Sequence, residues 1–186
     1  MTVSQEFIRI ENVVASSSSR QELDFESVAV VLTGADYDPE KFPGLIYRST
    51  DFRSTALMFC SGKVVCTGAK GIEDVHESME MLFNTFRDLQ IEVAEDPEII
   101  VQNIVSSADL GRNLNLNAIV VGFGLKEIEY KPEQFPGLVY RLNEPDVAAL
   151  LFSSGKLVVT GGKDTNDAEQ ALDVITKRLE DLGLLE

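Results

Sequence analysis

The sequence is poor in the residues that build metal and redox sites. Its 186 residues include one histidine, two cysteines and no tryptophan, and the cysteines, Cys60 and Cys66, do not form a CxxC pair. A zinc site needs a cluster of such ligands, so we expect neither a metal nor a cofactor. Both cysteines stand among apolar, strand-like residues, which predicts two buried, reduced thiols in a reducing compartment.

Long apolar runs are also missing. No run approaches the roughly 18 residues that cross a bilayer, and the N-terminus lacks the basic and then apolar pattern of a signal peptide. The hydrophobic content of 44% is ordinary for a folded domain. We therefore expect a soluble, cytoplasmic protein with a buried core and no membrane partner.

Basic residues are scarce and evenly spread. Residues 1–93 carry 8 basic and 15 acidic side chains, residues 94–186 carry 8 and 16, and the formal net charge is −15. Taken alone, this acidity argues against nucleic acid, because proteins that bind polyanions usually have net positive domains. A uniformly acidic surface is instead expected of a protein in concentrated salt, where charges are screened over a few ångströms. The placement of the few basic residues must decide the partner.

The chain is a tandem duplication. YDPEKFPGLIYR at residues 37–48 matches YKPEQFPGLVYR at residues 130–141 in nine of twelve positions, and FCSGKVVCTGAK at 59–70 matches FSSGKLVVTGGK at 152–163 at the same offset of 93. Asn12 and Asn103 open similar segments at an offset of 91. Chance does not produce such long matches in the same order. We expect repeats at residues 1–94 and 95–186.

Each copy should contain short strands and one long helix. The expected elements of the first copy are a strand at 7–16, a helix N-capped by Asp24 and ending at Val31, strands at 45–48, 55–60 and 63–67, and a helix at 72–89. Ser61 and Gly62 allow a tight hairpin between the last two strands. The long helices carry one apolar stripe each, at Ile72, Val75, Met79, Leu82, Phe86 and Leu89, and at Ala168, Ala171, Leu172, Ile175, Leu179 and Leu182. Each long helix should cover one side of a sheet.

The hairpin strands are apolar on both faces. Period two places Leu57 and Phe59 on one face and Met58 and Cys60 on the other, and the second copy repeats the pattern. One long helix per copy cannot cover both faces. Either another protein layer covers the second face, or that face is an exposed binding surface.

Basic residues favour the second explanation. Lys63 shares the second face with Val65 and Thr67, and Lys156 shares it with Val158 and Thr160. If Arg48, Lys70, Arg141 and Lys163 lie around its margins, six of the 16 basic residues gather there. An apolar face with a basic rim suits a nucleic-acid groove, which has phosphate walls and base edges inside.

The paired YxPExFPG…YR and FxSGKxVxTGxK segments, each with a preceding Asn-[Val/Ile]-Val, resemble the TATA-box-binding proteins over essentially the whole chain. The acidic composition is similar to the halophilic archaeal branch. The resemblance implies an α+β fold, a tandem-duplicated pseudo-twofold saddle whose curved antiparallel sheet binds the DNA minor groove and whose helices lie on the convex face. It also implies a general transcription factor that bends TATA-box promoter DNA by phenylalanine intercalation and nucleates assembly of the transcription initiation complex.

The resemblance assigns roles to residues in both copies. The implied intercalating residues are Phe42, Phe59, Phe135 and Phe152. The implied base contacts are Asn12, Asn103, Val14, Val105, Leu57, Leu150, Val65, Val158, Thr67 and Thr160. The implied phosphate contacts are Arg48, Arg141, Lys63, Lys156, Lys70 and Lys163.

The implied partners are double-stranded promoter DNA, transcription factor B and, indirectly, RNA polymerase. Glu133 matches a contact to transcription factor B, whereas Lys131 stands where eukaryotic relatives have an acid.

Two other functions deserve comparison. An enzyme is suggested only by the glycine-lysine segments, but Gly62 and Gly68 enclose five residues and Ala69 precedes Lys70, which departs from the Walker pattern. A protein-only scaffold would dimerise through the exposed sheet face, and a dimer in the absence of DNA is compatible with either function.

Overall fold

The computed structural model describes residues 8–48 and 53–185, and within these ranges the chain forms ten strands and four helices. The chain divides into two compact units, residues 12–102 and residues 1–11 together with 103–186. The sequence repeats were expected to meet at residues 94 and 95. The division into compact units does not test that boundary, which stays a prediction.

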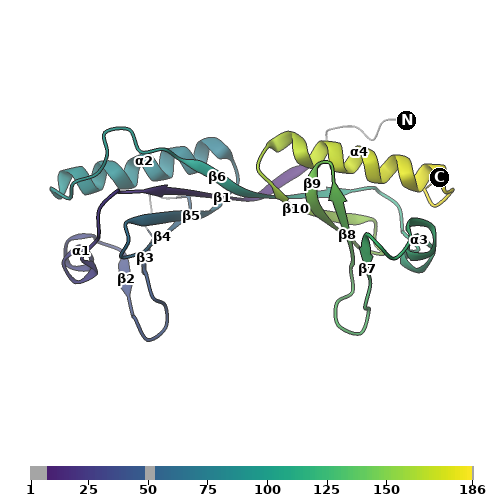
Figure 1. Cartoon of the computed structure of the whole chain (residues 1–186), viewed down its shortest axis with the longest axis horizontal. Helices are drawn as coiled ribbons and strands as arrows, with labels where there is room; N and C mark the ends of the chain where they lie inside the picture. Colours follow the sequence, from purple (N-terminus) through teal and green to yellow (C-terminus); the bar gives the residue numbers. More distant parts are fainter. Residues whose placement is uncertain (1–7, 49–52, 186) are drawn as a thin grey trace. The chain divides into compact units, whose positions relative to one another are not determined.

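The first unit is a five-stranded antiparallel sheet with one long helix. Its elements are β1 (Arg9–Ser18, of which residues 9–11 belong to the second unit), α1 (Phe25–Val31), β2 (Ala35–Tyr37), β3 (Leu45–Tyr47), β4 (Thr55–Met58), β5 (Lys63–Ala69) and α2 (Ile72–Asp88). The strand order is β2-β3-β4-β5-β1. In Figure 1, α2 lies along one side of β4 and β5, and the loop between β2 and β3 extends away from that helix.

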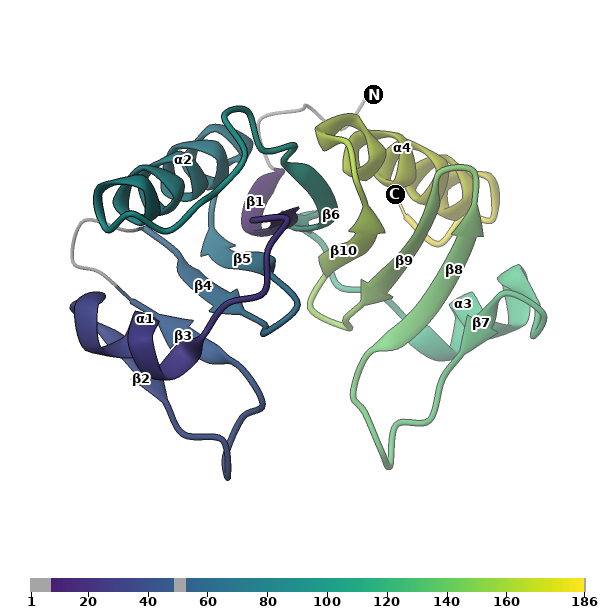
Figure 2. The same cartoon turned by 60° about the vertical axis from the view of Figure 1, so that its left-hand side comes forward.

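The second unit repeats this plan. Its elements are β6 (Ile100–Asp109), α3 (Leu116–Phe123), β7 (Ile128–Glu129), β8 (Leu138–Asn143), β9 (Asp146–Leu151), β10 (Lys156–Gly162) and α4 (Thr165–Asp181). The strand order is β6-β10-β9-β8-β7, again antiparallel throughout. Figure 2 shows α4 above β8, β9 and β10, with the loop between β7 and β8 on the far side from α4.

Side-chain caps define where the helices begin. Asp24 is the N-cap of α1, as predicted: its Oδ1 accepts from the Glu26 amide at 3.2 Å and its Oδ2 accepts from Ser27 Oγ at 2.5 Å. These hydrogen bonds, first that of Ser27, lower the pKa of the Asp24 carboxyl. In α4, Asp164 and Asp167 form a reciprocal capping box.

Most residues of the predicted apolar stripes are buried in the core, but Ile72 and Leu89 of the first stripe are half-buried, and Leu89 follows the last residue of α2. Val75, Met79, Leu82 and Phe86 of α2 are fully buried, and five of the six predicted stripe residues of α4 are buried. Leu182 is wrongly placed by the pattern, because α4 ends at Asp181 and the Leu182 cap residue is 43% exposed.

The cysteines differ from each other, which corrects the prediction. Cys66 is buried in β5 and shares a hydrogen bond of 2.9 Å with Ser54, and burial raises the pKa of its thiol. Cys60 is exposed, because β4 ends at Met58 and residue 60 lies in the turn that follows.

The ends of three strands also differ from prediction. The strand expected at 63–67 continues to Ala69, β3 ends one residue early at Tyr47, and β1 extends to Ser18. The predicted start of that first strand, Phe7, lies outside the described residues.

Candidate nucleic-acid interface

One face of the first sheet is covered by α2, and the other is open. Ala56, Met58, Val64 and Cys66 are completely buried on the helix side. The residues that alternate with them are half-buried, as strand parity predicts: Leu57, Val65, Thr67 and, in β1, Asn12 and Val14. Leu57 lies directly opposite Val65 across the β4–β5 ladder. We call this surface the open face of the first unit.

The second unit has the same open face. Ala149, Leu151 and Leu157 are fully buried on the helix side. Leu150 pairs with Val158 across the β9–β10 ladder, and these residues are half-buried together with Thr160, Asn103 and Val105. The predicted base-contact residues therefore gather, in each unit, on one half-buried surface.

An asparagine side chain is held rigidly on each open face. The Gly68 amide donates to Asn12 Oδ1 at 2.7 Å, and Asn12 Nδ2 donates to Thr67 Oγ1 at 3.2 Å. Asn103 makes the same two contacts, with the Gly161 amide at 2.7 Å and Thr160 Oγ1 at 3.2 Å. Because the oxygen is occupied by a backbone donor, the amide orientation is set, and one Nδ2 hydrogen remains for a ligand.

A β-bulge makes these hydrogen bonds of the asparagine, which we call the asparagine latch, possible. In the β1–β5 ladder, Val13 pairs with Ala69 but Ala15 pairs with Cys66, so β5 has one extra residue at Thr67 and Gly68. Gly68 has φ +96°, a conformation that favours glycine, and the bulge directs its N–H to the side chain of Asn12 in β1 rather than to a backbone carbonyl of that strand. Gly161, with φ +102°, does the same in β10.

Two phenylalanine pairs lie beside the open faces. The rings of Phe42 and Phe59 are 5.8 Å apart at 62°, and those of Phe135 and Phe152 are 5.8 Å apart at 70°. The first member of each pair comes from the loop between β2 and β3 or between β7 and β8. Phe135 is 39% exposed, although it is a large apolar side chain.

The second member of each pair is positioned by a closed hairpin turn. The Phe59 amide donates to the Lys63 carbonyl at 2.9 Å, and the Gly62 amide donates back to Phe59 at 2.8 Å. Phe152 has the equivalent bonds, with Lys156 at 3.0 Å and Gly155 at 2.9 Å. Edge-to-face contact with the partner ring then limits the orientation of each phenyl group.

The six predicted phosphate contacts are all exposed: Arg48, Lys63 and Lys70 in the first unit, and Arg141, Lys156 and Lys163 in the second. None of them forms an ion pair with any residue in the described ranges, whereas Lys41, Arg53, Lys131 and Arg178 do. The six cations thus remain available to an anion.

Four further residues share the open faces although the sequence did not single them out. Ile46 lies opposite Leu57, and Thr55 opposite Thr67. Val139 lies opposite Leu150, and Ala148 opposite Thr160. All four are half-buried. Counting strand parity outward from the buried Leu45 and Tyr47 would have identified Ile46.

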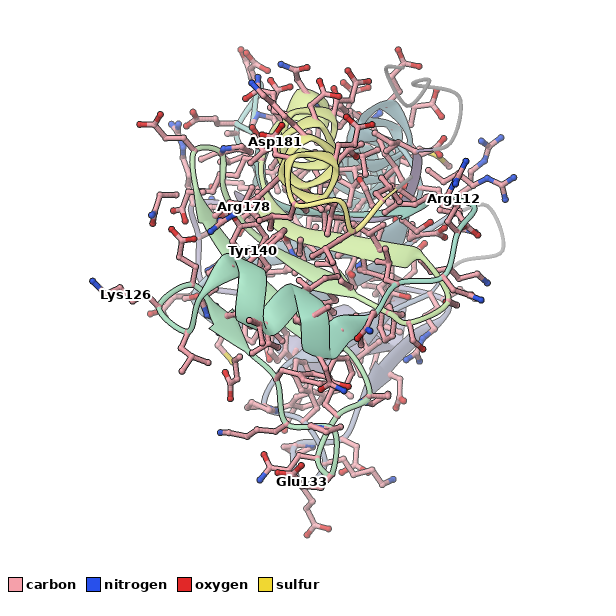
Figure 3. All side chains as sticks on the ribbon, turned by 90° about the vertical axis from the view of Figure 1, so that its right-hand side faces the viewer. Arg112, Lys126, Glu133, Tyr140, Arg178 and Asp181 are labelled. Carbon is pink, nitrogen blue, oxygen red and sulfur yellow. The ribbon has the colours of Figure 1, made fainter. Side chains whose placement is uncertain are left out.

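The loop between β7 and β8 projects from the second unit and carries Glu133. Figure 3 shows Glu133 at the tip of this loop, far from α4. Nearer the body, Lys131 forms an ion pair with Glu129 at 3.1 Å. Arg178 of α4 donates to Tyr140 Oη at 2.6 Å and to Glu127 at 2.9 Å, which ties α4 to β8 and to the segment before the loop.

Comparison with known proteins places this geometry in a family. The model of "Transcription factor TFIID (or TATA-binding protein, TBP)" matches the chain twice, at residues 7–89 and 98–182. The chain belongs to the TATA-binding protein family. It is 67% identical to the TATA-box-binding protein of Natronomonas pharaonis (98% of this chain, 97% of the relative) and 66% identical to TATA-box-binding protein E of Halobacterium salinarum (100% of both).

A solved structure confirms the fold class. The TBP of Methanococcus jannaschii superposes with a TM-score of 0.84 at 44% identity, covering 94% of this chain and 99% of that one. The predicted α+β class, with a duplicated antiparallel sheet and helices on one face, is thereby confirmed.

Family membership also bears on the enzyme hypothesis. The TATA-binding proteins are transcription factors and not enzymes, so the enzyme hypothesis is rejected. In the described part of the chain, no helix combines the length and the apolar character that crossing a membrane requires.

Proposed function

We propose that this protein binds A·T-rich promoter DNA from the minor-groove side, bends it, and presents the complex to the transcription machinery. The observation that carries the proposal is the duplicated open face, on which a latched asparagine, apolar side chains and a phenylalanine pair occur together twice. A single apolar patch would suit many partners, whereas this repetition suits a ligand with near-twofold symmetry.

The latched asparagines support recognition of A·T pairs. In the minor groove, A·T and T·A pairs present only acceptors, and a G·C pair adds the N2 amino group of guanine. The remaining Nδ2 hydrogen of Asn12 or Asn103 can donate to such an acceptor. Val65 and Val158 beside them offer no acceptor to a guanine amino group, which would be buried without a partner.

The phenylalanine pairs support bending. Apolar side chains that enter a base step unstack it at a cost of a few kcal/mol, and the cost is lowest at flexible steps such as TA. Wedging of this kind is a general property of the TATA-binding proteins, so the proposal follows from family membership as well as from ring geometry. The preference for TATA-like sequence then comes partly from deformability.

The unpaired cations support contacts to the two phosphate walls. Arg48, Lys63 and Lys70 flank one open face, and Arg141, Lys156 and Lys163 flank the other. Their contacts would position the duplex without selecting sequence.

The loop that carries Glu133 supports a protein partner. Its exposed acid and its distance from α4 (Figure 3) suit a basic surface on transcription factor B, through which RNA polymerase would be recruited. Lys131, which pairs with Glu129, stands where eukaryotic relatives have an acid, so the contact should differ in detail from that of those relatives.

Phe59→Ala and Phe152→Ala test the proposal. A duplex with dyes at both ends should show bending by energy transfer with the wild type and little with either variant, while circular dichroism shows an intact fold. Val121→Ala, at a residue of α3 that is 85% exposed, is the matched control and should bend DNA normally. Full bending by both phenylalanine variants would reject the proposal.

A second candidate follows from the same open faces. Half-buried apolar side chains on both units would also suit a dimer that excludes DNA. Small-angle scattering in high salt, without and then with a TATA duplex, distinguishes the two: a dimer that persists on DNA favours a protein-only scaffold, and a monomer–DNA complex favours promoter binding.

A further inference from the structure

The residue before each latched asparagine differs between the copies. Glu11 precedes Asn12 and Gln102 precedes Asn103, at equivalent positions of the repeat. Each side chain contacts a serine, and those serines are also equivalent. Ser107 Oγ donates to Glu11 Oε1 at 2.6 Å, and Gln102 Nε2 donates to Ser16 Oγ at 2.8 Å. Each contact lies within one compact unit.

The direction of the hydrogen bond is opposite in the two units. Ser107 uses its hydroxyl hydrogen for the carboxylate of Glu11, which has only acceptors. Ser16 accepts from Gln102, so its own hydrogen remains available, as does the second hydrogen of Gln102 Nε2. At this position one unit offers a charged acceptor and the other offers two donors.

Both positions belong to the proposed DNA interface. Ser16 lies opposite Val65 and Ser107 opposite Val158 in their ladders. Glu11 lines a groove of about 760 Å³ with Phe152, Lys156 and Val158. The corresponding groove of about 400 Å³ in the other unit includes Ser16 and Lys63. The second groove also contains an acid, Glu98, but no phenylalanine lines it. Only Glu11 therefore lies beside both a phenylalanine and a predicted phosphate contact.

We infer that Glu11 and Gln102 set the direction in which the protein sits on an asymmetric promoter. The inference rests on the proposed function. Phosphate oxygens and the minor-groove edges of A·T pairs are all acceptors, which match the donors of Gln102 and Ser16 and oppose Glu11. A guanine N2 amino group is the one donor of the minor groove, and it matches the Glu11 carboxylate. The Glu11 unit thus takes the end of the box that contains a G·C pair.

Orientation can be measured with one dye on the protein and one on the DNA. In a Cys60→Ser background, Glu180→Cys gives a single accessible thiol near the end of α4, since Cys66 is buried. The duplex has an A·T-rich box with a G·C pair at one end and a dye on either terminus. Wild type should place its Glu11 unit on the G·C end.

Two variants give the decisive comparison. Glu11→Gln should reduce the orientation ratio by about threefold and tighten binding, a change typical of one exposed charge interaction. The double variant E11Q/Q102E should reverse the preference. Glu77→Gln, an equal change of charge on the exposed side of α2, is the control and should leave the ratio unchanged.

The outcomes separate this inference from the proposed function. Unchanged orientation ratios in both variants, with DNA bending retained, would reject the inference alone. Failure of the wild type to bind or bend the duplex would reject the proposed function, and the inference with it.

Discussion

Asn12 and Asn103 are each held on an open face by two hydrogen bonds. Each oxygen receives a glycine amide at 2.7 Å, and each nitrogen donates to a threonine of the neighbouring strand. Such preorganisation matters because the ordering of the side chain is completed on folding and does not oppose binding. In the proposed complex, each asparagine would read a base edge with its single remaining hydrogen.

Asn12→Asp and Asn103→Asp should weaken binding to an A·T duplex by about tenfold or more each, roughly 1.4 kcal/mol. The aspartate keeps an oxygen for the glycine amide, so the latch and the fold survive, but it places an acceptor against minor-groove acceptors. Fluorescence anisotropy with a labelled TATA duplex measures the loss.

Asn113→Asp is the control for charge alone, since Asn113 is exposed in the segment between β6 and α3. If it weakens binding as much as Asn103→Asp, the asparagine latch is not a recognition element.

The ring positions in the two phenylalanine pairs depend on the glycine of each FPG segment. A Cβ added to Gly137 would lie 2.6 Å from Phe135 Cε1 and 3.0 Å from Phe152 Cε1, so it would meet only the rings of the wedge. A Cβ added to Gly44 would lie 2.6 Å from Phe42 Cε1 but also 2.6 Å from the Met58 carbonyl oxygen, which is backbone. The two glycines differ in what a methyl group would displace.

Gly137→Ala should impair DNA bending with a small loss of stability, because the phenyl rings can rotate away from the methyl group. Gly44→Ala should destabilise the first unit by roughly 1–3 kcal/mol, the usual cost of overpacking, because a ladder carbonyl cannot move freely. Thermal unfolding and energy-transfer bending, measured on both variants, check this difference. Equal losses of stability would show that the ring contact is not the main constraint at Gly137.

At the scale of elements, local signals predicted the fold well. The 3.6 period located the bounds of α2 within a residue and the buried face of α4, and Asp24 predicted the start of α1. Strand parity in β4 and β5 separated the open face from the buried face. Two strands were missed, β2 and β7, because three and two residues are too few for a period to emerge.

The details of the site depend on contacts that local patterns do not contain. The Asn12–Gly68 bond joins residues 56 positions apart, and it exists only because the β1–β5 register shifts at a bulge. The exposure of Cys60 likewise depends on where β4 ends, and the apolar residues that precede Cys60 gave no sign of that end. The duplication did predict that any such contact would occur twice.

For the whole molecule, the acidic surface and the polyanionic ligand are in conflict. The net charge is −15, and α2 and α4 carry many of the acids, while few cations stand at the open faces. The relatives from Natronomonas and Halobacterium belong to halophilic archaea. In concentrated salt the Debye length falls from roughly 10 Å at 0.1 M to about 3 Å at 1 M, so repulsion between the acidic helices and DNA is screened.

We expect affinity for a TATA duplex to hold or rise between about 0.1 and 1 M KCl, because loss of this repulsion offsets the release of counterions from the phosphate contacts. Titrations at several salt concentrations measure the slope. A steep, continuous loss of affinity, as ordinary basic DNA-binding proteins show, would contradict the expectation.

The amide signals of the bulge glycines, Gly68 and Gly161, can be measured separately for each unit by NMR spectroscopy. The amide protons of Gly68 and Gly161 are bound by a side-chain oxygen of the neighbouring strand rather than by a backbone carbonyl. Their exchange with deuterium therefore reports on the asparagine latch and not on the stability of the sheet. Two glycine amide signals in a nitrogen-15 spectrum would show which half of the molecule engages a promoter first.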